Sequence, residues 1–290
     1  MFKSFIISAR PKTLLVGLAP IILGTALAAN YKNGKLSPLI LTLTVLCTLL
    51  MQIGTNIVNE YYDHLDGVDT KDRMGPKRSI QLGHASPNQL KFFYQTCFSL
   101  SFFIGLGLVW NSDLIILATG VISILVAYMY TGGPLPLSHY YMGEFLAFLF
   151  FGPVAVLGTF YLHTSFFHLD ALVLSLIPGF ISAALMSLNN LRDIDTDKKT
   201  PKRTLPMLLG KNKAKFFTLF LGLAPLIISL FYFLSDPKPW NFITFLPPIL
   251  FIGLWKRVLT KEGIELNLGI AAFGKYNVLY CILYAVSLLQ

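Results

Sequence analysis

Charged side chains are scarce in this sequence, and their scarcity excludes an ordinary soluble domain. Asp, Glu, Lys and Arg make up 13% of the 290 residues, whereas hydrophobic residues make up 54%. Soluble domains usually contain about 25% charged residues. The mean hydropathy of +0.64 agrees with this contrast. The composition therefore predicts an integral membrane protein.

Cysteine is also rare, and no low-complexity tract is present. Cys47, Cys97 and Cys281 all lie in apolar runs without Cys-x-x-Cys spacing. We therefore expect neither a disulfide framework nor a cysteine metal site, and these side chains are predicted to be small buried hydrophobic groups. No polar stretch is long enough to form a second unit, so residues 1–290 are expected to form a single membrane domain.

Long apolar runs dominate the rest of the chain. A helix needs about 20 apolar residues to cross a bilayer. Runs near this length occur at 13–31, 38–58, 92–110, 113–130, 143–161, 169–188, 216–234, 240–255 and 266–289. The predicted fold class is all-α, a polytopic bundle of nine transmembrane helices.

Basic residues indicate how the bundle is oriented. The N-terminus and the loops after the second, fourth, sixth and eighth runs hold nineteen of the 23 Lys and Arg residues, and the opposite side holds three. Because Lys and Arg are retained in the cytoplasm, we expect a cytoplasmic N-terminus in the cell (inner or plasma) membrane. Topology and contact with acidic lipid account for the net charge of +9. No nucleic-acid partner is expected.

Two acidic segments, 130 residues apart, resemble each other. Residues 59–72 and 189–197 both begin with Asn-x-x-x-Asp and contain eight of the fourteen acidic residues. Each is followed by a Pro-Lys-Arg-Ser/Thr element, at 76–79 and 201–204. Such clustering and repetition are not typical of a solvated surface. The two segments follow the second and the sixth apolar runs, whose following loops are rich in Lys and Arg. The predicted topology therefore places both segments at the cytoplasmic face.

Helical spacing places several of these side chains on common stripes. Asn189, Asp193 and Asp197 are spaced i, i+4, i+8, and Asn59 and Asp63 begin a similar stripe. Closely stacked carboxylates repel one another unless a cation neutralises them. Oxygen ligands without His or Cys favour Mg2+ or Mn2+, so two ions holding a diphosphate are expected. The predicted metal ligands are Asp63, Asp66, Asp69, Asp193 and Asp197.

Basic residues beside the acidic segments could bind the remaining phosphate charge. The candidates are Lys77, Arg78, Arg192, Lys202 and Arg203. A simpler interpretation is that the acids lie at helix ends in water and pair with these residues, but it does not explain why the pattern occurs twice. A cation-coupled transporter is a distant alternative. It predicts carboxylates near mid-membrane, whereas both acidic segments here follow complete spans at the same face.

At these residues the sequence resembles the UbiA superfamily of intramembrane prenyltransferases, and most closely its branch that acts on 1,4-dihydroxy-2-naphthoate. The resemblance rests on both acidic segments and on residues 9–13, 19–25, 130–137 and 150–159. Two positions differ from the usual family pattern. Glu60 replaces Asp and keeps the charge, and Pro201 replaces Gly and stiffens a loop.

This resemblance implies a nine-helix bundle whose cytoplasmic loops cap a central cavity open to lipid. It implies Mg2+-dependent transfer of a polyprenyl group from its diphosphate to 1,4-dihydroxy-2-naphthoate, with loss of carbon dioxide and diphosphate, in menaquinone biosynthesis. The acceptor could instead be the 6-carboxylate isomer or 4-hydroxybenzoate, and the donor a phytyl diphosphate. No obligate protein partner is inferred.

The resemblance also assigns roles to residues. The catalytic set would be Asn59, Asp63, Asp66, Asn189, Asp193 and Asp197. Residues that could contact the acceptor or the prenyl group are Lys12, Tyr62, Tyr130 and Glu144. Either Lys12 or Arg192 could meet the acceptor carboxylate, and Glu144 could orient or deprotonate a hydroxyl.

The predicted topology can be tested by labelling. Single cysteines introduced near Asp72 and Lys199 should react with an impermeant reagent from the cytoplasmic side only, and one near Ser165 from the other side only, because the basic loops stay in the cytoplasm. The measurement is labelling of inside-out against right-side-out vesicles. Reaction of the Asp72 and Lys199 sites from opposite faces would contradict a shared active-site face.

Overall fold

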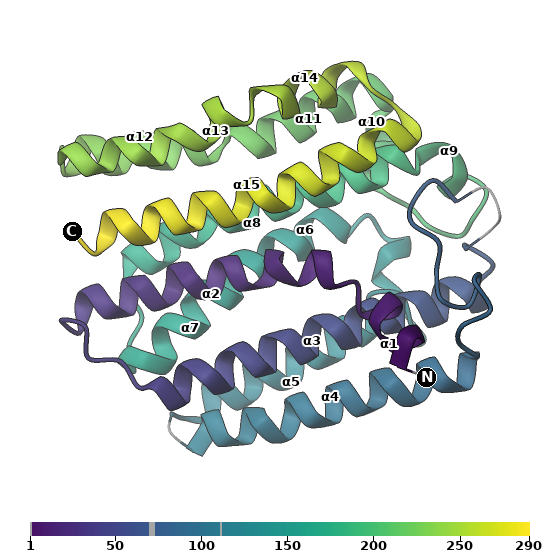
Figure 1. The fold of residues 1–290 in the computed structure, drawn as a ribbon, viewed down its shortest axis with the longest axis horizontal. Helices are drawn as coiled ribbons and strands as arrows, with labels where there is room; N and C mark the ends of the chain where they lie inside the picture. The colour runs from purple at the N-terminus through teal and green to yellow at the C-terminus, as the bar shows by residue number, and fades with distance from the viewer. Residues whose placement is uncertain (1, 70–72, 111) are drawn as a thin grey trace.

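The computed structural model describes residues 2–69, 73–110 and 112–290 as one bundle of long helices lying side by side (Figure 1). No strand occurs in these ranges. The helices are α1 (Phe2–Ala9), α2 (Pro11–Tyr31), α3 (Pro38–Leu65), α4 (Pro87–Trp110), α5 (Leu114–Met129), η1 (Leu137–His139), α6 (Gly143–Leu149), the π-helix η2 (Phe150–Val154), α7 (Ala155–Thr164), α8 (Leu169–Arg192), α9 (Ile194–Asp197), α10 (Leu205–Leu209), α11 (Lys211–Leu223), α12 (Pro225–Ser235), η3 (Pro239–Phe245), α13 (Leu246–Leu250), α14 (Ile252–Thr260), η4 (Gly263–Leu266) and α15 (Asn267–Leu288).

Eight helical segments of the described chain are long and apolar enough to cross a membrane. Some of them join several helices, as α6, η2 and α7 do over Gly143–Thr164. The run predicted at 113–130 forms α5, whose 16 residues are shorter than the other segments. The prediction of an all-α polytopic membrane protein is confirmed, and the count of nine spans stays a prediction.

Local sequence explains where several helices begin. Ser37 accepts a hydrogen bond from the backbone N–H of Ile40 at 3.4 Å, and Pro38 occupies the first position of α3. Asp113 caps α5 in the same way, accepting from the N–H of Ile115 at 2.9 Å. Side-chain caps satisfy N–H groups that have no partner within the helix. Inside the apolar spans the helix satisfies its own backbone, as lipid requires.

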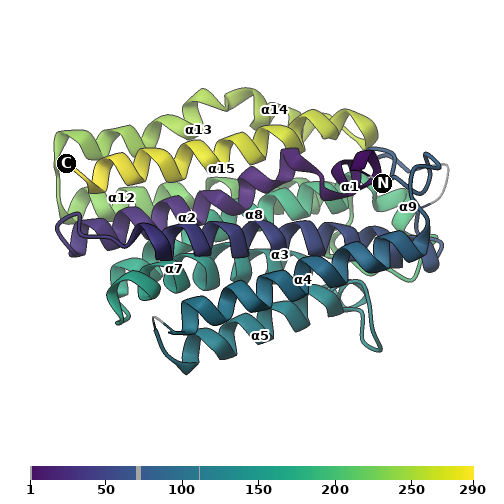
Figure 2. The ribbon, with the colours of Figure 1, turned by 60° about the horizontal axis from the view of Figure 1, so that its bottom comes forward.

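The main core is built around α8. Its side chains at Leu174, Ile177, Ile181 and Leu188 are fully buried against α2, α7, α11 and α15. A smaller core joins α3 to α4. None of the residues of α5, all of which the structure describes, is buried, and α5 lies at the edge of the bundle (Figure 2). The bundle is therefore firmly packed on the α8 side and more loosely on the α5 side.

The two acidic segments meet at one end of this bundle. The loop that follows α3 lies beside α9 and close to α1, at the end where the N-terminus is marked (Figure 1). The Lys202 Nζ atom, in the loop after α9, lies 2.9 Å from the Asp63 Oδ1 atom of α3. The prediction that both segments share a face of the protein is thus confirmed, while its assignment to the cytoplasm rests on the basic residues.

A close contact between glycines fixes η2 against α8. A Cβ atom at Gly152 would lie 2.7 Å from the backbone oxygen of Ser175 and 2.8 Å from the Cα atom of Gly179. Backbone atoms cannot move aside as a flexible side chain can. Small residues allow membrane helices to approach this closely.

We therefore expect Gly152→Leu to destabilise the protein by about 1–3 kcal/mol, the usual cost of overpacking. The measurement is the thermal unfolding midpoint of the purified protein in detergent. Gly253→Leu is the matched control, because a Cβ at Gly253 meets no atom within 4 Å and the residue is exposed on α14. Equal midpoints for the two variants would contradict the close contact.

Candidate active site

The first acidic segment is held by the end of α3. Gly67, with a φ of 67°, turns the chain so that the N–H groups of Val68 and Asp69 donate to the carbonyl of Asp63 at 2.9 and 3.1 Å. Glycine adopts this left-handed conformation without steric cost. The turn places Asp69 beside Asp63, and their side chains are only 1% and 5% exposed.

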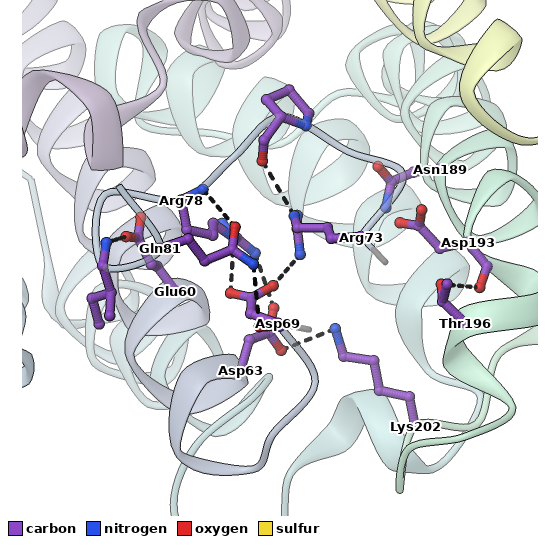
Figure 3. Close-up of polar contacts among 12 residues, drawn as sticks. Glu60, Asp63, Asp69, Arg73, Arg78, Gln81, Asn189, Asp193, Thr196 and Lys202 are labelled. Atoms are coloured by element: carbon purple, nitrogen blue, oxygen red, sulfur yellow. Dashed lines mark hydrogen bonds and ion pairs between the residues drawn. The ribbon is translucent and has the colours of Figure 1, made fainter. Parts of the chain in front are cut away.

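Basic side chains compensate these buried carboxylates (Figure 3). The Arg78 guanidinium contacts Asp63 at 2.9 Å and Asp69 at 3.1 Å, and Arg73 also pairs with Asp69. Lys202 approaches Asp63 from the other segment at 2.9 Å. A buried carboxylate without such partners would be strongly destabilising. The pairs therefore allow carboxylates to be concentrated in a site shielded from water.

Burial and charge act in opposite directions on these groups. Burial raises the pKa of Asp69 to about 6, although the nearby Arg73 lowers it. Burial lowers the pKa of Lys202, but the carboxylates of Asp63 and Asp197 outweigh this effect and raise it above the usual value. Lys202 is therefore a cation at neutral pH and links the two segments electrostatically.

The second segment spans a break in the helix. α8 ends at Arg192, Asp193 follows it, and α9 is a single turn. Backbone bonds nevertheless continue from the N–H of Asp193 to the oxygen of Asn189 at 3.2 Å, and from the N–H of Asp197 to the oxygen of Asp193 at 2.8 Å. The predicted stripe is thus kept in register, although it does not lie on one uninterrupted helix.

Arg192 and Asp197 have very different surroundings. Arg192 is buried and donates to Asp193 at 2.5 and 2.8 Å, to Asn189 at 3.0 Å and to Asn267 of α15 at 2.8 Å. The Asp197 side chain is also buried, but no described residue forms a hydrogen bond or ion pair with its carboxylate. Burial raises the pKa of Asp197 to about 6. Asp197 is therefore a buried carboxylate that forms no ion pair within 4.0 Å among the described residues, and the charge of Lys202 acts on it from a longer distance.

Other predicted site residues lie apart from this cluster. Asp66 and Lys77 are exposed, and so is Arg203, which donates to the backbone oxygens of Thr200 and Lys202 at 3.1 and 2.7 Å. The side chain of Lys12 falls outside the described part of the structure. These placements bring Asp63, Asp69, Asp193, Asp197, Arg78, Arg192 and Lys202 to the site, with Asp66, Lys77 and Arg203 at its periphery.

The carboxylates of the described chain do not form a closed metal cage. No three Asp, Glu, His or Cys side chains in those ranges are grouped closely enough to hold an ion. Mg2+ usually binds through one or two carboxylates and completes its shell with water and substrate phosphates. The buried carboxylate of Asp197, which forms no ion pair with any described residue, and the oxygen-only donor set fit such a partly open site.

An apolar cavity of about 390 Å3 reaches Asn59, the first residue of the first acidic segment, and extends along the spans. Asn59, Tyr130, Gly143 and Met186 line the end that lies near the acidic segments. The remaining wall comes mostly from hydrophobic residues of α2, α3, α4, α5 and α7. The arrangement suits a ligand with a charged head and a long apolar tail.

The proposed acceptor residues are divided between the cavity and the packing around it. Tyr130 lines the cavity, and Thr131 donates to the Asn59 side chain at 2.8 Å. Glu144 is buried, with one oxygen accepting from Asn190 at 2.9 Å and the other without a hydrogen-bond partner in the described chain. Tyr62, in contrast, does not line the cavity and bonds to the hydroxyl of Tyr128 at 2.6 Å.

Sequence reasoning missed two basic residues at the site. Arg73 pairs with Asp69, four positions before it, a spacing that could have indicated the pair. Arg10 precedes α2 with a φ of 51°, and one of its guanidinium nitrogens is buried without a hydrogen-bond partner among the described residues. Burial and the charge of Arg73 lower the pKa of Arg10 to about 10. Arg10 belongs to the segment at 9–13 noted above, but no role was assigned to it.

Together the fold and the site define a polytopic membrane enzyme with a charged head site above an apolar tail cavity. The chain belongs to the UbiA prenyltransferase family, whose family model matches residues 17–266. It is therefore a prenyltransferase.

Curated relatives and solved structures agree with this assignment. Proteins named 1,4-dihydroxy-2-naphthoate octaprenyltransferase are 32% identical in Haemophilus influenzae, covering 97% of this chain and 94% of the relative, and 33% identical in Escherichia coli, covering 89% and 86%. The structure of a UbiA homologue from Archaeoglobus fulgidus bound to DMAPP and Mg2+ has a TM-score of 0.71 at 16% identity, covering 99% of both chains. At that identity the structural likeness concerns the fold alone.

The different surroundings of Asp197 and Asp195 allow a matched test. Asp197→Asn should reduce prenyl transfer on the order of 100-fold, because losing one group that positions a metal already costs 10–100-fold. Asp195→Asn is the control, since Asp195 is exposed and pairs with Lys211 at 2.7 Å outside the site. The measurement is turnover of the purified variants at limiting Mg2+. Normal turnover of Asp197→Asn would remove it from the metal site.

Proposed function

We propose that this protein transfers a polyprenyl group from polyprenyl diphosphate to 1,4-dihydroxy-2-naphthoate, releasing diphosphate and carbon dioxide and forming demethylmenaquinol for menaquinone biosynthesis. The observation that carries the proposal is the apolar cavity that reaches Asn59 of the first acidic segment, which Lys202 joins to the second segment. The names of the curated relatives support the naphthoate as acceptor.

The diphosphate would bind between the two acidic segments. Without a ligand, carboxylates pair with Arg78, Lys202 and Arg192. These pairs hold the basic groups where a diphosphate would bind. Exchange of a carboxylate for a phosphate partner keeps each basic group compensated during binding. Arg10 and Arg73 supply further positive charge at the same place.

Divalent cations would take the carboxylates that these basic residues release. The candidate ligands are Asp63, Asp69, Asp193 and Asp197, with Asp66 at the periphery. We propose two Mg2+ ions, replaceable by Mn2+, one at each acidic segment; the described carboxylates form no complete cage, so water and phosphate oxygens would complete each shell. When bound, Mg2+ neutralises charge on the diphosphate and so makes it a better leaving group.

The chain's own residues would then control where the prenyl group and the ring meet. The bond between the prenyl carbon and the diphosphate oxygen breaks, and a bond forms to the ring carbon that loses the carboxylate as carbon dioxide. Asn59 and Tyr130 line this end of the cavity, and the Tyr130 ring can face the allylic cation. Glu144 follows Gly143 of the cavity wall, and its oxygen without a partner in the described chain could take a proton from a ring hydroxyl and return it when carbon dioxide leaves. Tyr62 does not line the cavity, and its hydrogen bond to Tyr128 would hold the helices that form the cavity wall.

The orientation of the enzyme is part of this proposal. The site lies at the end of the bundle that carries most Lys and Arg residues, so we place it at the cytoplasmic face of the cell membrane. A water-soluble naphthoate would enter from the cytoplasm. The apolar tail of the donor would remain among the spans.

The acceptor can be identified with purified protein, Mg2+ and a polyprenyl diphosphate. In separate reactions we expect 1,4-dihydroxy-2-naphthoate to be prenylated with release of carbon dioxide. We expect 4-hydroxybenzoate to react poorly, because a site wide enough for a two-ring acceptor holds a single ring less firmly. The measurement is product formation by mass spectrometry. Chelation with EDTA should stop the reaction, and Mg2+ should restore it.

The other outcomes of this panel would change the assignment. Preference for the 6-carboxylate isomer would change only the position of the acceptor carboxylate. Preference for 4-hydroxybenzoate would contradict the naphthoate assignment while keeping the prenyltransferase. Full activity in metal-stripped protein would contradict the metal role of the aspartates.

A further inference from the structure

The carboxamide side chains that line the central cavity all come from one face of α3. They are Gln52, Asn56 and Asn59, which follow one another at intervals of four and three residues. This spacing places them on a single stripe of the helix. In the described part of the chain, no charged side chain lines the cavity. The carboxamide stripe is therefore a polar strip in a largely apolar wall, and it runs from the first acidic segment into the membrane.

Most hydroxyl groups in the same wall bond to their own helices. Five of them donate to the backbone oxygen four residues earlier, at 2.7 or 2.8 Å, and they belong to Thr44, Thr55, Thr119, Ser123 and Thr159. Such a bond satisfies a hydroxyl within its own helix. These groups therefore do not require a ligand.

Two of the three carboxamides are held by the protein itself, whereas Gln52 is not. Asn56 donates to the backbone oxygen of Ala9 at 3.0 Å, and Asn59 accepts from Thr131 at 2.8 Å. The Gln52 amide nitrogen is shielded from solvent and forms no hydrogen bond with any described residue. An amide without a partner is costly in the apolar layer of a membrane, because lipid supplies none. The unpaired amide therefore points to a polar ligand.

Gly17 of α2 makes room for the Gln52 amide. A Cβ atom built at residue 17 would lie 1.1 Å from the Gln52 Nε2 atom, so the amide occupies space that any larger residue would fill. Gly17 is buried and also lines the cavity. A glycine inside a helix is normally destabilising relative to alanine. The room that it gives to Gln52 explains why a glycine stands at this position.

The chemistry of the two substrates shows which of them meets Gln52, and this step rests on the proposed function. The donor tail is a hydrocarbon and would leave the amide unpaired. The acceptor carries a carboxylate at ring position 2 and hydroxyls at positions 1 and 4. Its carboxylate is an anion and belongs at the charged end, near basic residues such as Arg10 and Arg78.

Depth along α3 then selects one of the two hydroxyls. Gln52 lies one helical turn beyond Asn56 and two turns beyond Asn59, on the side away from the charged end. A ring whose carboxylate is at the charged end presents its more distant hydroxyl, at position 4, to this depth. The hydroxyl at position 1 is adjacent to the carboxylate and stays closer to the charged end.

We propose that Gln52, positioned by Gly17, recognises the hydroxyl at position 4 of the acceptor ring through a hydrogen bond, and that this contact sets the preference for a 1,4-dihydroxy ring. A carboxamide has both a donor and an acceptor, so it can pair with a hydroxyl in either direction. Binding of the ring satisfies the amide that the protein alone leaves unpaired. An acceptor that lacks this hydroxyl leaves the amide unpaired and binds more weakly.

The experiment compares 1,4-dihydroxy-2-naphthoate with 1-hydroxy-2-naphthoate, which lacks only the hydroxyl at position 4. Affinities are measured by titration calorimetry on the purified protein with Mg2+ and inorganic diphosphate, and the dihydroxy ring is kept reduced. The wild-type protein should bind the dihydroxy acceptor about tenfold more tightly, the usual effect of one hydrogen bond. In Gln52→Met, whose side chain has a similar length and no amide, the two affinities should agree within about twofold.

Two further variants complete the comparison. Gly17→Ala should weaken the preference as well, because the added methyl group displaces the amide while the helix itself gains stability. Gln95→Met is the matched control, since Gln95 is exposed on α4 and does not line the cavity. This control should keep the wild-type preference.

Thermal unfolding separates recognition from packing. Replacing an unpaired buried amide by an apolar group is neutral or stabilising, so the unfolding midpoint of Gln52→Met should be no lower than that of the wild-type protein. A lower midpoint would show that the fold itself uses the amide, and it would overturn the proposed role.

The binding data have equally definite outcomes. A wild-type preference that persists in Gln52→Met, or equal affinities of the wild-type protein for the two acceptors, would overturn the role of Gln52. An equal loss of affinity for both acceptors in Gln52→Met would overturn it too. Failure of the wild-type protein to prenylate the dihydroxy acceptor would instead contradict the proposed function, because binding is measured without transfer.

Discussion

The ion pair between Lys202 and Asp63 joins the two halves of this protein at the site where they meet. Lys202 follows α9 and Asp63 belongs to α3, and their charged atoms are 2.9 Å apart. Both groups are largely shielded from water, where an unpaired charge would be strongly destabilising. The contact therefore couples the position of the second acidic segment to that of the first. The proposed metal site and the proposed donor site both depend on that relative position.

Charge compensation also explains how a site with so many carboxylates can exist before a ligand binds. Arg78, Arg73 and Arg192 each contact an aspartate, so the cluster is nearly balanced in the protein alone. A diphosphate added to this balance would bring uncompensated negative charge unless cations entered with it. The use of a divalent metal agrees with the electrostatics of the site, and the buried Asp197 is one of its proposed ligands.

The two sides of the bundle have different mechanical roles. Around α8 the helices are closely packed, with glycine contacts such as that of Gly152, which hold the second acidic segment in place. The α5 side carries no buried residue over 114–129 and borders the cavity. Regions with few buried contacts open at lower free energy. The bundle therefore has a closely packed half, which holds the second acidic segment, and a more loosely packed half beside the cavity.

The sequence alone determined the membrane class, the apolar runs and the repeated acidic segments, because hydropathy and helical spacing are local properties of the chain. It also indicated that Asp63 and Asp193 belong together. Only the tertiary structure decided that Asp69 turns inward while Asp66 remains exposed, since this depends on the turn at Gly67. The placement of Arg10 beside the acidic segment and the pairing of Arg192 with Asn267 likewise depend on helices distant in sequence. Such contacts arise when the chain packs, and no local pattern specifies them.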